Sequence, residues 1–459
     1  MKRFWLVLLS LGLVMAFSAS AFAVDVNVSG EYFVGGLYLN KISVNDNNQV
    51  NVGTPSSPIN VSANPSTAFF YQRLRVETDF IVSPGLKFIT RINALERVWG
   101  GARNTPGTTL NSDSAGTRAE DENFAFDWAY IDYTSPIGTF DVGYMQTSDT
   151  GTIFNNSTTP GGRIKYTTIP FGPLTFNAKI TKTADNSYSY NNIVSYTNAD
   201  KTQYAIEGKY KWKYGLAGMQ IQYNDYANTE PTSNYASKYT QFNPYVIAKI
   251  GPVDIQAEIA YAVGTLKEYD SGSTSTDVQL SNLAAFLDVT ANFAPIYVGG
   301  TVAYVSGDDP NTKDRQEGGT VTGGNDFNPC LILFSYYDLT YWVGTINGYG
   351  NSTTGVTSVV DGPMTNAWFG QGRIGFKPIS DLDVKLSLSY AQADQKPAGF
   401  TGGTYGTEVD VTGTYKITNN LSYMLGFGYL FTGDYFKGTS GTNKVDDDYL
   451  LINKLTLTF

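Results

Sequence analysis

Charged residues occupy every second position in one short segment of the chain. They are Arg73, Arg75, Glu77 and Asp79, and they alternate with Leu74, Val76, Thr78 and Phe80. Residues with a period of two share one face of an extended strand, so this segment would have one charged face and one apolar face. A row of fixed charges in water attracts ions and selects among them. The chemistry that the segment indicates is therefore electrostatic.

Most enzymatic chemistry is excluded by residue types that the chain lacks. The 459 residues include no histidine and one cysteine, Cys330. There is no imidazole base or metal ligand, no haem-attachment motif and no internal disulfide. A serine or threonine nucleophile would need a lysine or carboxylate beside it, and no such constellation is recognisable. We predict no catalytic residue, no metal site and no cofactor, and we do not expect an enzyme.

The first 23 residues have the pattern of a secretory signal peptide. Lys2 and Arg3 precede an apolar run from Phe4 to Phe17, and small residues offer a cleavage site after Ala23. A membrane anchor that stays is the alternative, but the run is shorter than the roughly 20 residues that span a bilayer. The formal net charge of −10 becomes more negative after cleavage, which disfavours a nucleic-acid partner.

The rest of the chain, residues 24–459, reads as strands in a single domain. No later apolar run is long enough for a spanning helix, and the charged fraction of 16% is low for a soluble domain. Alternation with a period of two recurs at 382–390 and 421–429. A soluble β-sandwich would also alternate in this way, so alternation alone does not distinguish the two architectures.

The alternation of short turns with long loops favours a membrane β-barrel over a soluble β-sandwich. Eight short turns are expected at 83–85, 135–138, 170–173, 213–215, 251–252, 294–295, 378–381 and 418–420. Long polar loops are expected near 41–67, 100–122, 147–162, 184–202, 227–238, 264–277, 307–363, 395–404 and 432–445. This asymmetry is typical of a transmembrane antiparallel up-and-down β-barrel. The count gives about 18 strands, with 16 as the alternative, and the first and last strands should pair because lipid offers no hydrogen bonds to an open edge.

One segment does not fit the count of strands. Residues 331–346 are apolar enough for a strand, but a single extra crossing would put the next short turn on the wrong side. We interpret the segment as part of a large loop at 307–363 that is extracellular or folded inward. An additional hairpin is the alternative, and Cys330 is expected to be a bystander thiol.

Several stretches resemble the general trimeric porins of the Gram-negative outer membrane. These are residues 73–77, 128–133 with 137–144, and 161–168 with the turn and strand that follow. The chain also ends in a similar pattern, with Phe459 last and Leu457, Leu455 and Leu451 on the apolar face. The resemblance implies a homotrimeric, water-filled channel for passive diffusion of ions and small polar solutes. It also implies contact with outer-membrane lipid and lipopolysaccharide, and recognition of the last strand by the barrel-assembly machinery.

The resemblance places a constriction loop near 147–162 and a set of charged residues facing the lumen. They are Arg73, Arg75, Glu77, Asp79, Arg91, Arg97, Asp127, Asp149, Arg163 and Lys165. We expect the cations to stand opposite the carboxylates and to create a transverse field, although any one arginine could instead pair locally. Departures from the family are Ala125 and Asp127 where an arginine is common, and a single carboxylate in the loop. A substrate-selective channel, or a closed barrel serving as a scaffold or adhesin, stays open, as do ion selectivity and the physiological solute.

Overall fold

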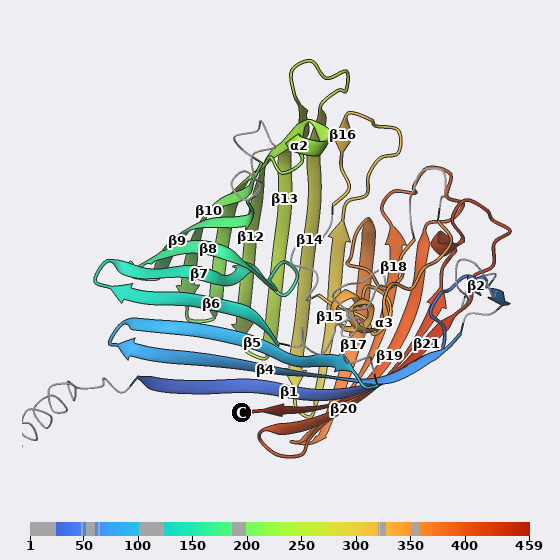
Figure 1. The fold of residues 1–459 in the computed structure, drawn as a ribbon. Coiled ribbons are helices and arrows are strands. Elements are labelled where there is room, and N and C mark those ends of the chain that lie inside the picture. Colours follow the sequence, from blue (N-terminus) through green and yellow to red (C-terminus); the bar gives the residue numbers. More distant parts are fainter. Residues whose placement is uncertain are drawn as a thin grey trace, which may run out of the picture.

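A computed structural model describes residues 24–46, 49–51, 60–62, 65–100, 124–185, 199–319, 321, 327–350 and 358–459. Eighteen antiparallel strands form one closed barrel, and every pair of successive barrel strands is hydrogen-bonded (Figure 1). This confirms the fold class and the strand number expected from the sequence. The signal peptide expected at 1–23 and most of the loop expected at 100–122 lie outside the described residues.

The barrel strands are long, as spanning strands must be when they are tilted. In chain order they are β1 (Asp25–Leu39), β4 (Thr67–Ser83), β5 (Leu86–Val98), β6 (Phe124–Ser135), β7 (Gly138–Ser148), β8 (Ser157–Thr168), β9 (Leu174–Ala184), β10 (Lys201–Trp212), β11 (Gly215–Tyr226), β12 (Tyr235–Ile250), β13 (Val253–Tyr269), β14 (Val278–Phe293), β15 (Ile296–Val305), β17 (Ala367–Ile379), β18 (Leu382–Ala393), β19 (Thr404–Lys416), β20 (Leu421–Thr432) and β21 (Asp448–Thr458).

The first strand closes the barrel. In the register of β1, Leu37 pairs with Phe69 on β4 and with Ile452 on β21. No strand edge is then left unpaired, which matters in hydrocarbon because each unpaired backbone group costs several kcal/mol.

Alternation along each strand separates an apolar outside from an inside that is packed or polar. On β18, Leu386 and Leu388 are 45% and 56% exposed, whereas Ser387 between them is buried. The residues expected as the assembly signal are exposed: Leu451, Leu455 and Leu457 on β21, and Phe459 directly after it. The residues that alternate with a period of two in the sequence therefore point alternately to the apolar outer surface and to the interior of the barrel.

The eight short turns expected from the sequence join strands at one end of the barrel, called here the short-turn end. Both the start of β1 and Phe459 lie at this end, because Asp25 pairs with Ile81 beside the first turn and Phe459 bonds to Gly30. The opposite, long-loop end carries the minor elements β2 (Gln49–Asn51), β3 (Asn60–Ser62), α2 (Glu230–Ser233), β16 (Arg315–Gln316) and η3 (Asp434–Lys437). Within the described ranges, no helix has both the length and the apolar character to cross a bilayer.

The large loop between β15 and β17, residues 306–366, folds into the barrel. Its residues 331–346 form no strand but two short helical turns, the π-helix η2 (Tyr336–Thr340) and α3 (Tyr341–Val343) (Figure 1). Trp342 packs against Tyr71 on β4, with ring centroids 4.4 Å apart. Ile332 and Leu333 are completely buried, and their backbone N–H groups donate to Glu408 on β19. The inward-folded interpretation is thus confirmed, and the extra hairpin is wrong, because the apolar side chains of this segment find their partners inside the barrel.

Candidate channel constriction

A short loop between β7 and β8 crosses the barrel interior. The strands end and begin at Ser148 and Ser157, so this connection is shorter than the 147–162 expected. On β13, six strands further round the wall, Glu258 Oε2 accepts hydrogen bonds from the backbone N and the Oγ1 of Thr152, at 2.6 and 2.7 Å. Loop 149–156 is therefore attached to the wall about one third of the way round the barrel from its own strands.

The tip of this loop is apolar and meets the large loop. Phe154 is completely buried and stacks on Phe286 of β14, with ring centroids 5.1 Å apart. Phe327, from loop 306–366, lies nearly perpendicular to Phe154, with ring centroids 5.3 Å apart. Burial of an aromatic side chain of this size contributes roughly 1.5–3 kcal/mol. The two loops thus share one apolar contact inside the barrel.

Gly151 permits the close approach of loop 149–156 to the wall. Its φ of +94° lies in the region that favours glycine. A Cβ at this position would collide with the carboxylate of Glu258. The glycine therefore brings the neighbouring Thr152 within hydrogen-bonding distance of that carboxylate.

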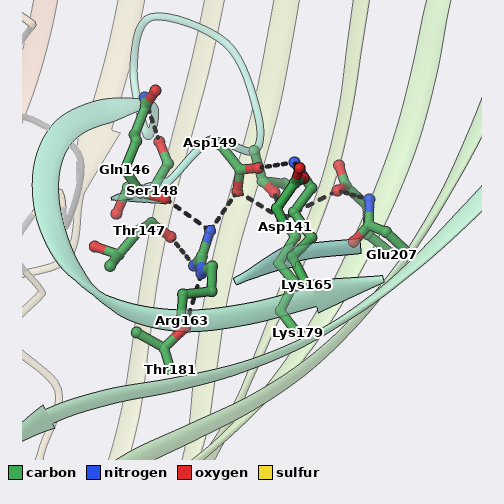
Figure 2. Close-up of polar contacts among 12 residues, drawn as sticks. Asp141, Gln146, Thr147, Ser148, Asp149, Arg163, Lys165, Lys179, Thr181 and Glu207 are labelled. Atoms are coloured by element: carbon green, nitrogen blue, oxygen red, sulfur yellow. Dashed lines mark hydrogen bonds and ion pairs between the residues drawn. The ribbon is translucent and has the colours of Figure 1, made fainter. Parts of the chain in front are cut away.

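At the base of the same loop, Asp149 gathers three cations from two strands. Lys179 Nζ on β9 donates to Asp149 Oδ1 at 2.7 Å, and Arg163 Nη1 on β8 donates to the same oxygen at 2.8 Å (Figure 2). Lys165 Nζ donates to Oδ2 at 3.0 Å. Burial by itself would raise the pKa of the Asp149 carboxyl, but the charges of Lys179, Lys165 and Arg163 outweigh it and hold that pKa well below its usual range.

A second layer of carboxylates and neutral groups surrounds this cluster. Glu207 on β10 lies 3.2 Å from Lys179 Nζ, and Asp141 on β7 lies 3.6 Å from Lys165 Nζ. Arg163 also donates to Thr181 Oγ1 at 2.9 Å and to the carbonyl oxygens of Gln146 and Thr147 (Figure 2). We call Asp149, Arg163, Lys165 and Lys179 the Asp149 cluster.

Further round the wall, Asp127 on β6 holds a second group. Arg91 Nε and Asn93 Nδ2 donate to Asp127 Oδ2 at 3.1 and 2.9 Å, and Arg75 Nη2 lies 3.5 Å away. The Arg91 guanidinium also lies 3.4 Å from the ring centroid of Trp128, a cation–π contact. We call Arg75, Arg91, Asn93 and Asp127 the Asp127 cluster.

Arg73 has a different role from its neighbour Arg75. Its side chain is buried and donates from Nη1 to the Tyr337 hydroxyl in the large loop at 3.0 Å. Glu96 and Glu31 lie 3.5 and 3.7 Å from the guanidinium. Arg73 therefore holds the large loop against β4 rather than facing open water.

Two other predicted lumen residues lie on β4 beside these clusters. Glu77 stands opposite Arg91 in the β4–β5 register. Asp79 lies nearer the short-turn end, 3.6 Å from Lys87 Nζ. Both are on the inner face, but neither contacts loop 149–156.

The expectation that Arg97 faces the lumen is wrong. Leu95 has a φ of +52°, and the β4–β5 register shifts near it. After this bulge the inward position belongs to Glu96, which is buried beside Arg73. Arg97 instead pairs with Gln72, whose side chain points outward and accepts a hydrogen bond from the exposed Trp99. One extra residue in the strand reversed the alternation.

The predicted carboxylates do not stand opposite the predicted cations across the interior. Cations and carboxylates are intermixed on one wall, β4 to β10, where Asp127 and Asp149 each contact cations directly. The loop carboxylate lies against its own strands because only the tip of the loop reaches across.

Three charged residues of the constriction were not singled out from the sequence: Lys179, Glu207 and Glu258. Each occupies an inward position of an expected strand. Alternation within those strands could have placed them on the inner face, but the contacts of Lys179 and Glu258 with loop 149–156, and of Glu207 with Lys179, required the fold.

One group of potential metal ligands occurs among the described residues. The ligand atoms of Cys330, Glu408 and Asp410 lie within 4.8 Å of one another. Both oxygens of Glu408 already accept backbone hydrogen bonds, from Ile332 and Leu333, each at 2.7 Å. Burial raises the pKa of the Cys330 thiol, which disfavours the thiolate that binds metals. This group serves to attach the large loop to β19.

Comparisons with known proteins identify the fold. No family model matches the chain, and no curated protein matches it. Among solved structures, OccK2 (OpdF) of Pseudomonas aeruginosa is 11% identical, with a TM-score of 0.51 over 95% of this chain and 98% of that one. A BenF-like porin from Pseudomonas fluorescens Pf-5 is 9% identical, with a TM-score of 0.50 over 95% and 99%. At such identities the likeness concerns the fold, which is that of outer-membrane porins; membership of the general trimeric group stays a prediction.

Proposed function

We propose that the chain forms a channel in the outer membrane of a Gram-negative bacterium, through which ions and small hydrophilic solutes diffuse passively. One observation carries the proposal: a closed barrel has an apolar outer surface, while its inner wall carries ion pairs and loop 149–156 extends into its interior. A closed strand barrel satisfies every backbone group in hydrocarbon, and charged side chains inside it are useful where water and solutes pass. The porin fold of the solved structures agrees with this function.

A substrate-selective channel is the form of this function that the interior favours. Loop 149–156 and loop 306–366 meet at Phe154 and Phe327, so the interior is narrowed from two sides. The cations of the Asp149 and Asp127 clusters each lie near a carboxylate. A narrow passage with balanced charges discriminates by size and by hydrogen bonding more than by net charge. Trimer formation, lipopolysaccharide contact and recognition by the assembly machinery remain predictions from the resemblance.

Conductance tests the proposal directly. Purified mature protein in planar bilayers should give stable conductance steps, and proteoliposomes should swell in small neutral solutes up to a sharp size limit. A closed barrel acting as a scaffold or adhesin would give neither steps nor swelling, and that result would overturn the proposed function.

A further inference from the structure

The interior of the barrel has a second wall that is polar but uncharged. It follows β11, whose inward side chains are Gln220, Gln222, Asn224 and Tyr226, whereas Ile221 and Tyr223 between them are exposed outside. Gln203 on β10 and Gln241 on β12 stand on either side. We call these six residues the amide wall. It contrasts with the paired charges on β4 to β9.

Hydrogen bonds connect the amide wall into a ladder. Gln203 Nε2 donates to the Tyr226 hydroxyl at 2.5 Å, and Tyr226 donates to Asn224 Oδ1 at 3.0 Å. Gln222 Nε2 donates to the same Asn224 oxygen at 2.9 Å, and Gln220 Nε2 donates to Gln222 Oε1 at 3.4 Å. The ladder thus runs along β11 from Tyr226 at the long-loop end to Gln220 near the middle of the strand.

The lower end of the ladder touches the constriction. Gln220 Oε1 accepts from Thr150 Oγ1 in loop 149–156 at 2.8 Å and from Lys179 Nζ at 3.1 Å. A solute that bound along the ladder would therefore lie directly above the Asp149 cluster, on the approach from the long-loop end.

A cavity of about 230 Å³ lies against the amide wall. Besides Gln203, Gln220, Gln222, Gln241 and Tyr226, its lining consists mainly of hydroxyl and amide side chains of the strand ends and loop 149–156. A second cavity of about 280 Å³ shares Gln241 and adds Asn282 and Gln316. Gln241 lines both cavities, but most other residues that line the second cavity are alanine, leucine and glycine.

The wall retains hydrogen-bonding capacity that the protein does not use. The Gln241 amide makes no side-chain hydrogen bond to any residue that the structure describes. Each primary amide has two donors and an acceptor oxygen, but the ladder uses one N–H each of Gln203, Gln220 and Gln222. The Asn224 Nδ2 group is buried without a partner within the described chain. Buried amides of this kind call for external partners that both donate and accept.

The charges around the cavity favour a neutral solute. Its lining among the described residues has no carboxylate and one cation, Lys201, whose Nζ lies 4.8 Å from the ring centroid of Tyr226. The nearest other cations are held by Asp149. A cation would find no carboxylate here, and an anion would find only Lys201, which already lies against the Tyr226 ring, whereas hydroxyl groups exchange water for amides at little cost.

We infer that the amide wall is a binding subsite for neutral polyhydroxylated solutes, that is, uncharged sugars and polyols, on the path into the constriction. The inference rests on the proposed function for its place in a passage, but the binding itself is a separate property. Hydroxyl groups of such a solute would replace water on Gln222 and Gln241, and the ladder would hold these amides in place.

Calorimetric titration of detergent-solubilised mature protein with glucose tests the binding without requiring conductance. The wild type should bind glucose saturably, and gluconate, its anionic counterpart, at least tenfold more weakly. The double variant Gln222→Met and Gln241→Met, which keeps side-chain length but removes both amides, should weaken glucose binding at least tenfold. Gln279→Met is the matched control, because Gln279 is exposed on β14 outside this wall, and it should bind like the wild type.

Three results would overturn the inference: no saturable binding of glucose, equal or tighter binding of gluconate, or equal glucose binding by the double variant. Block of ion current by glucose in planar bilayers is the second measurement, with each variant referred to its own current. Conductance steps without any glucose binding would contradict only this inference. Glucose binding without conductance steps would contradict only the proposed channel.

Discussion

Glu258 on β13 accepts two hydrogen bonds from Thr152, one from its backbone N and one from its hydroxyl, although β13 lies five strands round the wall from β8. The carboxylate is buried, and the residue before Thr152 is a glycine that fits against it. This pair fixes how far loop 149–156 extends across the interior. Because Thr152 is held at β13, Phe154 at the tip of the loop reaches the neighbouring strand β14, where it stacks on Phe286.

Glu258→Ala should release loop 149–156 and widen the passage. The variant leaves two buried donors of Thr152 without an acceptor, at about 1–3 kcal/mol for each. Single-channel conductance should rise by roughly half or more and become noisier. Glu268→Ala on the same strand removes only an exposed ion pair with Lys238 and should conduct like the wild type. Unchanged conductance and noise in Glu258→Ala would mean that the loop does not set the bore.

Asp149→Asn should shift the channel toward anions. Three cations then lose the carboxylate that they share, and Glu207 and Asp141 balance them only in part. The chloride-to-potassium permeability ratio, from reversal potentials in a salt gradient, should rise severalfold. Because the pKa of Asp149 is held low, the wild type should keep its selectivity as the pH falls to about 4, where ordinary carboxyls begin to protonate. Replacement of Asp314, a loop carboxylate outside the cluster, should leave the ratio unchanged.

Arg73 and Arg75 should give different phenotypes although they are two residues apart. Arg75→Gln removes a cation beside Asp127 and should shift the reversal potential toward cations. Arg73→Gln breaks the bond to Tyr337 and should mainly destabilise the large loop, measured as faster hydrogen exchange at 327–346. The double variant should show both effects. An unchanged reversal potential in both Arg75→Gln and the double variant would remove these residues from the constriction.

The sequence predicted the barrel well because the period of two and the turn chemistry are local signals. Leu386 and Leu388 face outward, as alternation requires, and the eight short turns were recognisable from their glycine, proline and asparagine residues. The site was predicted less well. Arg97 was misplaced because a bulge at Leu95 has no clear sequence signal. Glu258 was missed because its partner Thr152 lies 106 residues away.

Stability of the large loop should fall as the pH rises through neutrality, because of Asp361. Burial raises the pKa of this loop carboxyl from its ordinary value of 3.8 to about 7, despite the hydrogen bond that it accepts from Ile346 N. The folded loop therefore binds the proton more tightly than the unfolded chain does. The stability of the folded loop is therefore highest below about pH 4, where Asp361 is protonated in both states. It falls between about pH 4 and pH 7, by at most roughly 4 kcal/mol.

Hydrogen exchange at residues 327–346, corrected for the intrinsic effect of pH, measures this loss. Protection should decrease between pH 5 and pH 8 in the wild type and should decrease less in Asp361→Asn. Asp314→Asn, in the same loop but exposed, should follow the wild type. A wild-type loop whose protection is constant over this range would contradict the assignment to Asp361.

Glu408→Ala should detach the large loop from β19. Its two oxygens are the acceptors for the buried N–H groups of Ile332 and Leu333, so the variant leaves two buried donors unpaired and weakens the attachment by about 2–6 kcal/mol. We expect a lower melting temperature and larger, fluctuating conductance, because the loop would no longer be held in the interior. Cys330→Ser, a near-isosteric change beside the same carboxylate, should leave conductance unchanged. If Glu408→Ala melted earlier but conducted like the wild type, the loop would stabilise the barrel without narrowing it.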